Sequence, residues 1–278
     1  MTTWLLLSII ITSVLILFLL LYLFVFRNKT EKLNTSSSLS SSSSGPSGPS
    51  SGTSSSLSLD KLPIYIEIDN FLTNDECDSL IKQAENILVR SPVMSVKNGK
   101  YENAIDNVRT SMQTFLKNDK NDAIVTKIEN ALNSEPIKAQ LNLQPVNKKQ
   151  FENIQVVRYQ PSQEYREHYD ICHPTQAPSE HLEACKAEFK QFNCVRYLTV
   201  LFYLNDGYKG GQTKFTNLNQ VVTPKKGKAL IFVNCAPNET TQETGLCDLL
   251  PNSQHAGLPV QAGEKWIANV WIRCKNIK

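Results

Sequence analysis

Two side chains able to bind a metal, His168 and Asp170, stand two positions apart in the segment "YREHYD". In an extended strand, residues i and i+2 point to the same face, so this imidazole and this carboxylate would be directed at one point. The spacing therefore suits two ligands of a single metal ion. The alternative is a solvated turn, because His-x-Asp triplets also occur by chance.

A third possible ligand, His255, stands ten residues before Lys265, and a Pro/Gly-containing turn separates them. If the two segments pair as antiparallel strands, His255 and Lys265 face the same cavity. Together with His168 and Asp170, His255 completes two imidazoles and one carboxylate, the set that binds Fe(II) facially and leaves coordination positions open. The alternative for His255 is an ordinary buried structural histidine.

The segment "EKWIANVWIRC" predicts a strand with two buried faces. Its alternation places Lys265, Ile267, Asn269 and Trp271 on one face. A lysine directed into an interior needs an anionic partner or loses its charge, because an unpaired buried ammonium is too costly. The alternative is that Lys265 begins the strand and extends to water.

The elements that would position these residues form an α+β pattern. Residues 63–73 alternate like a strand, residues 74–88 have helical periodicity with a cap at Asn74 or Asp75, and a second helix is expected at 121–133. From Phe151 onward strands dominate, at 152–160, 196–206, 220–234 and 265–274. We expect a β-sandwich or barrel supported by N-terminal helices.

The N-terminal part is not globular. Residues 4–26 carry no charge and are long enough to cross a bilayer, so residues 1–27 are predicted to be an uncleaved transmembrane signal anchor. Residues 28–60, rich in Ser, Gly and Pro, are predicted to be a flexible linker, with a modified stalk or phosphorylated segment as the alternative. Residues 61–278 would then form one folded domain.

The side of the membrane is ambiguous from sequence. Arg27, Lys29 and Lys32 follow the span, and by the positive-inside rule they favour a cytoplasmic domain. Against this, glycosylation acceptors occur at Asn28, Asn34 and Asn238. We expect a single-pass glycoprotein of the endoplasmic reticulum or secretory membrane with a luminal domain, and the cytoplasmic orientation stays open.

The net charge limits the possible binding partners, and the number of cysteines limits the possible disulfides. A net charge of +3 without a basic stripe argues against nucleic-acid binding. Seven cysteines leave at least one unpaired, and Cys77 fits a buried helix position. In a lumen, disulfides are possible among the loop-like positions Cys172, Cys185, Cys194, Cys235 and Cys247, with the pairing open. Residues 172–194 are expected to be an insertion, in which His173, His181 and Cys185 leave zinc as an alternative to a disulfide or plain loop.

Taken in order, the blocks "RYQPSQEYREHYD", "RYLTVLFYLNDGYKGGQTKF", "VVTPKKGKALIFVN" and "QHAGLPVQAGEKWIANVWIR" resemble the Fe(II)/2-oxoglutarate dioxygenases of the prolyl 4-hydroxylase family. "IEIDNFLTNDECDSLI" and "NVRTSMQTFL" also resemble that family, so the likeness covers nearly all of residues 62–274. The order of anchor, Ser-rich linker and catalytic domain is similar to membrane-anchored members from plants and large DNA viruses.

The resemblance implies a double-stranded β-helix, or jelly-roll, core. It implies that His168, Asp170 and His255 bind Fe(II) and that Lys265 pairs with the distal carboxylate of 2-oxoglutarate, the four forming the catalytic set. The cofactors implied are Fe(II), 2-oxoglutarate, O2 and L-ascorbate. The function implied is hydroxylation of peptidyl proline to 4-hydroxyproline, coupled to conversion of 2-oxoglutarate to succinate and CO2.

The resemblance also assigns supporting roles. Tyr159 and Thr199 would donate hydrogen bonds at the Lys265 end of 2-oxoglutarate, Trp271 would line the pocket wall, and Arg109 would contact substrate or form a structural salt bridge. In the "GGQTKF" block, Gln212 stands where the family commonly has glutamate, which puts any charge-dependent contact there in doubt.

The partner implied is a proline-rich or collagen-like protein, since an extended polyproline helix presents its rings without unfolding. Two alternatives remain. A dioxygenase of the same superfamily could act on another substrate; the nucleic-acid demethylases of that superfamily generally have arginine at the position of Lys265. A catalytically inactive jelly-roll could serve as a binding module, which is disfavoured because all three ligands and the lysine are present.

Overall fold

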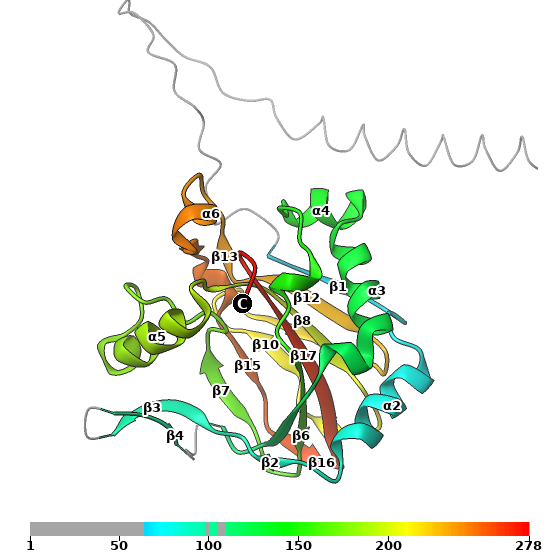
Figure 1. The fold of residues 1–278 in the computed structure, drawn as a ribbon. Coiled ribbons are helices and arrows are strands. Elements are labelled where there is room, and N and C mark those ends of the chain that lie inside the picture. The colour runs from blue at the N-terminus through cyan, green and yellow to red at the C-terminus, as the bar shows by residue number, and fades with distance from the viewer. Residues whose placement is uncertain (1–63, 98–99, 105–108, 278) are drawn as a thin grey trace, which may run out of the picture. The chain divides into compact units, whose positions relative to one another are not determined.

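A computed structural model of the 278-residue chain describes residues 64–97, 100–104 and 109–277 (Figure 1). The predicted transmembrane anchor (1–27) and linker (28–60) lie outside the described residues. Within the described residues, no helix has the length and apolar character needed to cross a membrane.

Two antiparallel sheets form the centre of the domain. The larger sheet has seven strands in the order β1-β12-β8-β17-β6-β5-β2, and the smaller has four in the order β11-β10-β15-β7. The large-sheet strands are β1 (Tyr65–Ile68), β2 (Val89–Arg90), β5 (Met112–Leu116), β6 (Ile154–Tyr159), β8 (Arg196–Tyr203), β12 (Ala229–Val233) and β17 (Lys265–Arg273). The small-sheet strands are β7 (Tyr165–His168), β10 (Thr213–Phe215), β11 (Gln220–Val222) and β15 (His255–Gly257).

The chain passes back and forth between these sheets. β6 lies in the large sheet, β7 in the small, β8 in the large, β10 and β11 in the small, β12 in the large, β15 in the small and β17 in the large. Eight antiparallel strands divided in this way make a jelly-roll. The predicted α+β fold with a jelly-roll core is thus present, and side chains on the inner faces of both sheets point at a shared interior.

Helices cover the outer face of the large sheet (Figure 1). α2 (Asn74–Ala84) buries Leu80, and α3 (Asp122–Leu132) buries Ile128, each fully enclosed. They join the same apolar core as Val270, which lies on the outer face of β17. The cap of α2 is Thr73, whose hydroxyl accepts from the Glu76 amide while the Glu76 carboxylate accepts from the Thr73 amide, a capping box rather than the predicted Asn74 or Asp75 cap.

The remaining elements are short. They are β3 (Val93–Lys97), β4 (Lys100–Ala104), α4 (Glu135–Leu141), β9 (Lys209–Gly210), β13 (Cys235–Ala236), α6 (Thr241–Thr244), β14 (Asp248–Leu249) and β16 (Val260–Ala262), with 3-10 turns η2 (Asn118–Asn121), η3 (Lys148–Gln150) and η4 (Pro251–Ser253). The single strand expected at 220–234 is two strands, β11 and β12, which lie in different sheets because the Pro224–Gly227 turn separates them.

The expected insertion contains a helix, α5 (Ser179–Phe192), which lies beside the small sheet (Figure 1). A disulfide joins Cys172 to Cys185 of this helix, and a second joins Cys235 to Cys247. Because Cys185 is bonded to sulfur, the zinc alternative at His173, His181 and Cys185 lacks its thiolate. Of the two alternatives to zinc, the disulfide is the one observed.

Candidate active site

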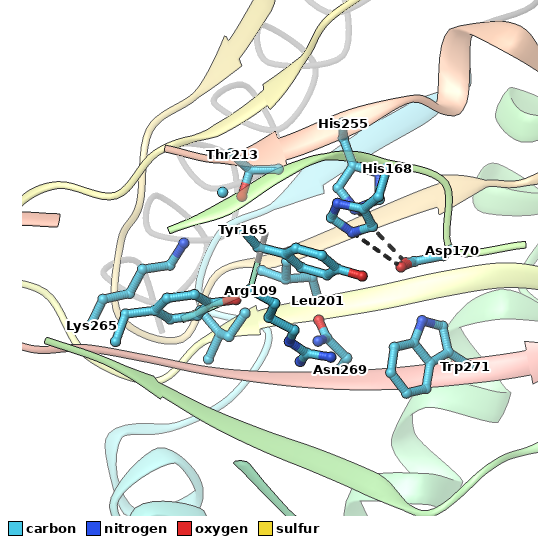
Figure 2. A pocket seen from close by; sticks show the side chains of 13 residues that line it. Arg109, Tyr165, His168, Asp170, Leu201, Thr213, His255, Lys265, Asn269 and Trp271 are labelled. Carbon is cyan, nitrogen blue, oxygen red and sulfur yellow. Dashed lines mark ion pairs between the residues drawn. The ribbon is translucent and has the colours of Figure 1, made fainter. Parts of the chain in front are cut away.

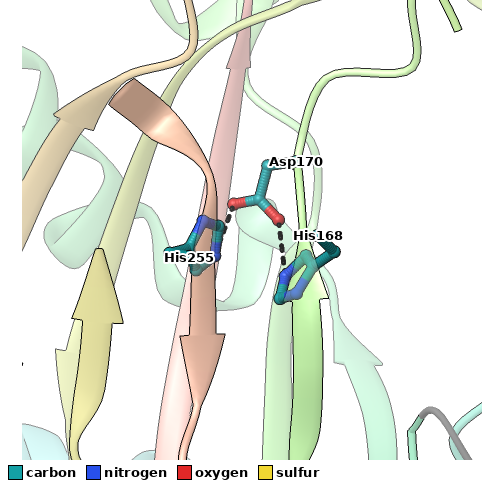
Figure 3. A group of neighbouring side chains, drawn as sticks. All are labelled: His168, Asp170 and His255. Carbon is teal, nitrogen blue, oxygen red and sulfur yellow. Dashed lines mark ion pairs between the residues drawn. The ribbon is translucent and has the colours of Figure 1, made fainter. Parts of the chain in front are cut away.

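The three predicted metal ligands converge on one point at the end of the small sheet (Figure 3). His168 is the last residue of β7, and it lies directly opposite His255 of β15 in the antiparallel register. Asp170 follows in a bend, with Oδ1 at 3.6 Å from Nε2 of His168 and Oδ2 at 3.9 Å from Nε2 of His255. One ligating atom from each residue lies within 4.8 Å of the others.

Backbone carbonyls fix the orientation of both imidazoles. Nδ1 of His168 donates to the Arg166 carbonyl at 2.7 Å, and Nδ1 of His255 donates to the Ser253 carbonyl at 2.9 Å. A carbonyl can only accept, so the proton of each neutral ring lies on Nδ1 and Nε2 keeps its lone pair. Both rings therefore present Nε2 to the common point, as metal-binding histidines do.

The electrostatics at this point favour the ligating protonation states. Burial and, to a smaller extent, the neighbouring His168 lower the pKa of His255 to about 4. Burial alone would raise the pKa of Asp170, but the adjacent His255 and His168 rings hold it well below its usual range. At neutral pH the site thus offers neutral His255 and ionised Asp170, the forms that bind a divalent cation.

Thr199 of β8 lies at this metal end of the pocket. Its hydroxyl donates to Oδ2 of Asp170 at 2.7 Å and accepts from Nδ2 of buried Asn234 at 2.9 Å. Thr199 pairs with Trp271 in the sheet register, six residues and roughly 20 Å of strand from Lys265. The expectation that Thr199 contacts the Lys265 end is therefore corrected: its hydrogen bond is satisfied by the carboxylate ligand.

Lys265 lies at the other end, on the first residue of β17, and it is 2% exposed. This excludes the alternative in which the side chain extends to water. Its ammonium donates to the Gly211 carbonyl at 2.7 Å and lies 5.1 Å from the ring centroid of Tyr159. Burial lowers the pKa of Lys265 to about 7.

Gly211 packs directly against this lysine. A Cβ at Gly211 would meet Cδ of Lys265 at 3.1 Å, and the backbone φ is +68°, so glycine suits the position both sterically and conformationally.

His255 and Lys265 do face one pocket, as expected, but they do not pair with each other. β15 bonds to β10 and β7, whereas β17 bonds to β6 and β8, so the two residues look across from opposite sheets.

Thr213 is a pocket residue that the sequence reasoning missed. It is 2% exposed on β10, lines the same pocket as Lys265, and its hydroxyl accepts from the Tyr203 hydroxyl at 2.8 Å. The Thr213 hydroxyl keeps its own proton available for a ligand. The segment "GGQTKF" contains the signal that could have identified it: Thr213 follows Gln212 directly, and adjacent residues of a strand point to opposite faces.

The inner face of β17 forms one wall of the pocket (Figure 2). Lys265, Ile267, Asn269 and Trp271 all line it, as the predicted alternation requires. In Figure 2, Tyr165 lies between Lys265 and the metal-ligand group. Its ring stacks on His168 at a centroid distance of 3.5 Å.

Arg109 and Trp271 also line the pocket, at positions expected from the sequence. Arg109 stacks over Tyr165 with its guanidinium carbon 4.8 Å from the ring centroid and donates to Gln155 at 3.3 Å. No salt bridge of Arg109 occurs among the described residues. The guanidinium carbon of Arg196 lies 3.6 Å from the ring centroid of Trp271. The same guanidinium donates to the Asp170 carbonyl at 3.4 Å, so Arg196 connects Trp271 to the residue that carries the carboxylate ligand.

The donor set fits Fe(II). Two imidazole nitrogens and one carboxylate oxygen, all from one side, match a facial arrangement with open positions for other ligands. The buried lysine and Thr213 supply a cation and a hydroxyl donor at the far end of the same pocket. A dicarboxylate with one end at the metal and the other at Lys265 satisfies both.

Comparison with known proteins agrees with this geometry. Residues 154–273 match the 2OG-Fe(II) oxygenase superfamily. A protein of Acanthamoeba polyphaga mimivirus, provisionally named a prolyl 4-hydroxylase, is 46% identical over 122 residues, which are 44% of this chain and 45% of that protein. Prolyl 4-hydroxylase 2 of Arabidopsis thaliana is 32% identical over 225 residues, which are 73% of this chain and 65% of that protein.

Among solved structures, the viral collagen prolyl hydroxylase of Paramecium bursaria Chlorella virus-1, in its complex with 2OG, superposes with a TM-score of 0.54 at 30% sequence identity. That match covers 79% of this chain and 99% of the viral one. The chain spans less than two thirds of the length of the two curated relatives above. With the metal-ligand geometry and a match at 30% identity over nearly all of a solved viral prolyl hydroxylase, the chain belongs to the prolyl 4-hydroxylase family of the 2OG-Fe(II) oxygenase superfamily.

Proposed function

We propose that the protein hydroxylates peptidyl proline to 4-hydroxyproline. One O2 and one 2-oxoglutarate are consumed for each C–H bond converted to C–OH, and succinate and CO2 are released. The observation that carries this proposal is the pairing of two features in one pocket: three ligating atoms within 4.8 Å of one another and a lysine that is 2% exposed.

Fe(II), when bound, supplies the activation of O2 and the oxidation of the substrate C–H bond. The chain's own residues bind and orient. His168 and His255 present Nε2, Asp170 presents its carboxylate, and Lys265 and Thr213 hold the distal carboxylate of 2-oxoglutarate.

We propose a proline-rich or collagen-like polypeptide as the substrate. Support comes from the names of the relatives, which are prolyl 4-hydroxylases, and of the viral structure, which is a collagen prolyl hydroxylase. An extended polyproline segment suits such a site, since it exposes its rings without unfolding. L-ascorbate is proposed as the reductant that keeps the iron in the Fe(II) state.

The test is a turnover assay with the full-length chain purified in mild detergent. Fe(II), ascorbate, 2-oxoglutarate and peptides of collagen-like, poly-Pro and Ser-Pro sequence are supplied, and succinate release and peptide oxygenation are measured. We expect peptide-dependent succinate with one oxygen gained at proline. The matched controls are His168→Ala, which should lose iron, and Gln212→Ala, which alters a pocket-neighbouring residue without removing a ligand.

Each alternative function has its own result. Succinate release without any peptide that becomes oxygenated indicates a dioxygenase with another substrate. Peptide binding without succinate release, in protein shown to hold iron, indicates an inactive binding module. Either result overturns the proline assignment.

We also propose that residues 1–27 anchor the chain in a secretory membrane with the catalytic domain in the lumen. Two disulfides, Cys172–Cys185 and Cys235–Cys247, support an oxidising compartment. Asn238, in an Asn-x-Thr triplet, is exposed and available for glycosylation. A glycosidase-sensitive mass that Asn238→Gln abolishes is expected in cells, and absence of glycan from an otherwise secretory chain contradicts luminal topology.

A further inference from the structure

Three cysteines remain outside the two disulfides, and two of them lie together. Cys77 is buried in α2. Cys194 immediately precedes Val195 and β8, and Cys274 immediately follows β17, the strand that neighbours β8 in the large sheet. The antiparallel register therefore brings the two residues to the same end of the sheet.

Several contacts hold this pair in place. The Cys274 amide donates to the Val195 carbonyl at 3.1 Å, and the Cys274 thiol donates to the Gly245 carbonyl at 3.2 Å. The same Gly245 carbonyl accepts from the Val195 amide at 2.9 Å, so Cys274 is tied to the residue that follows Cys194. The Cys194 thiol in turn lies 3.4 Å from the Phe192 carbonyl and 3.6 Å from the carbonyl of Lys275, the residue that follows Cys274. The two cysteines are 0% and 3% exposed.

We propose that Cys194 and Cys274 form a third disulfide, which closes the chain between the start of β8 and the end of β17. The proposal is independent of the catalytic function. It leaves Cys77, which is buried in α2, as the single thiol of the seven-cysteine chain.

The oxidant is an external disulfide such as oxidised glutathione. The Cys194 thiolate attacks one sulfur of that disulfide, which breaks its S–S bond and releases one glutathione thiolate. The Cys274 thiol gives up its proton and attacks the Cys194 sulfur of the mixed disulfide, releasing the second glutathione. Two electrons and two protons thus pass from the cysteine pair to the external disulfide, and one S–S bond forms for the one broken.

The order of the two attacks is interchangeable, because in the unfolded chain both cysteines have an ordinary thiol pKa and either thiolate can attack the external disulfide first. Because both sulfurs are enclosed in the folded domain, the exchange takes place during folding, before the end of β17 is covered.

The crosslink would secure the end of the strand that carries the pocket wall. Arg273, the last residue of β17, already donates to the Cys194 carbonyl at 2.7 Å and to Glu188 of α5 at 2.9 Å. A covalent bond at the next residue would add to these contacts. It would fix β17, and with it Trp271, against β8 and α5.

The test counts thiols after oxidative refolding. The reduced, denatured full-length chain is refolded with a mixture of reduced and oxidised glutathione, denatured again without reductant and labelled with a maleimide. We expect one label per chain, in place of the three that two disulfides alone would leave. Protease digestion without reductant should release a peptide containing Cys194 joined to one containing Cys274.

Two variants identify the remaining thiol. Cys77→Ala should carry no label, and Cys274→Ala should carry two, on Cys77 and Cys194. Three labels on the wild-type chain, or a crosslinked peptide that contains Cys77, would overturn the proposal. Peptide mapping distinguishes these outcomes even where a variant refolds in low yield.

Discussion

Binding of 2-oxoglutarate should weaken as the pH rises above neutrality, because Lys265 loses its charge. Burial lowers the pKa of Lys265 to about 7, and its only hydrogen-bond acceptor within the described residues is the Gly211 carbonyl. A bound carboxylate favours the ammonium and raises the pKa of the lysine. Binding above pH 7 must therefore take up a proton, and only the protonated fraction of the free protein is competent.

The magnitude follows from that single titration. Below the pKa the lysine is charged and affinity is constant, and above it each pH unit weakens binding about tenfold. Between pH 6 and pH 8, the dissociation constant should rise about tenfold for a pKa near 7. The iron ligands do not add to this slope over the same range, because metal binding keeps them deprotonated.

The assay is anaerobic calorimetric titration of 2-oxoglutarate into the Fe(II)-loaded chain at pH 6, 7 and 8. The matched control is Lys265→Arg, whose guanidinium stays protonated throughout and whose binding should change less than about twofold. Equal affinity of the wild type at pH 6 and pH 8 would refute the reasoning, because it would mean that Lys265 is charged in the free protein. An equal slope in Lys265→Arg would assign the titration to another group.

The same pKa affects the stability of the ligand-free protein. Between about pH 7 and the ordinary pKa of lysine, the unfolded chain binds a proton at Lys265 that the folded chain does not. Stability contributed by this group therefore rises with pH across that window and is lowest below it, the opposite of a salt-bridged lysine.

Two further outcomes are expected. Thr199→Val removes the hydrogen bond to Oδ2 of Asp170 and should weaken Fe(II) or Co(II) binding about 10- to 100-fold in a direct titration. The control Thr223→Val, at an exposed site, should leave metal affinity unchanged. Unchanged affinity in Thr199→Val would show that Thr199 does not orient the Asp170 ligand. Adding Co(II) at about 100 times its dissociation constant should raise the free energy of unfolding by about 2.7 kcal/mol, measured by thermal unfolding. His255→Ala removes one of the three ligands and should abolish this stabilisation. Equal stabilisation of the variant would show that the metal binds at another site.

The sequence was most informative where one strand alone determines geometry. The period of two put Lys265, Ile267, Asn269 and Trp271 on one face, and the structure places all four on the pocket wall. The distribution of helices before strands likewise predicted the α+β fold. Such features depend on residues close in the chain, so they can be read without knowing the tertiary arrangement.

Features that depend on distant segments could not be read in this way. Thr199 bonds to Asp170 across 29 positions, and nothing local to either residue indicates the contact. The sheets occupied by β15 and β17 were also unpredictable, because strand pairing is decided by crossovers rather than by sequence proximity. The pairing of Cys172 with Cys185 was one of several combinations that composition allowed.

Burial of Lys265 lowers the stability of the ligand-free protein, and the function explains why the lysine is nevertheless buried. No carboxylate lies within ion-pair distance of its ammonium in the part of the chain that the structure describes, and the side chain is 2% exposed. A buried cation without an anionic partner destabilises a folded protein, and an apolar residue would fill the same space at lower cost. The arrangement is understandable if the partner is a ligand: the carboxylate that Lys265 lacks within the protein is the one that 2-oxoglutarate brings, at the end of the pocket opposite His168 and Asp170.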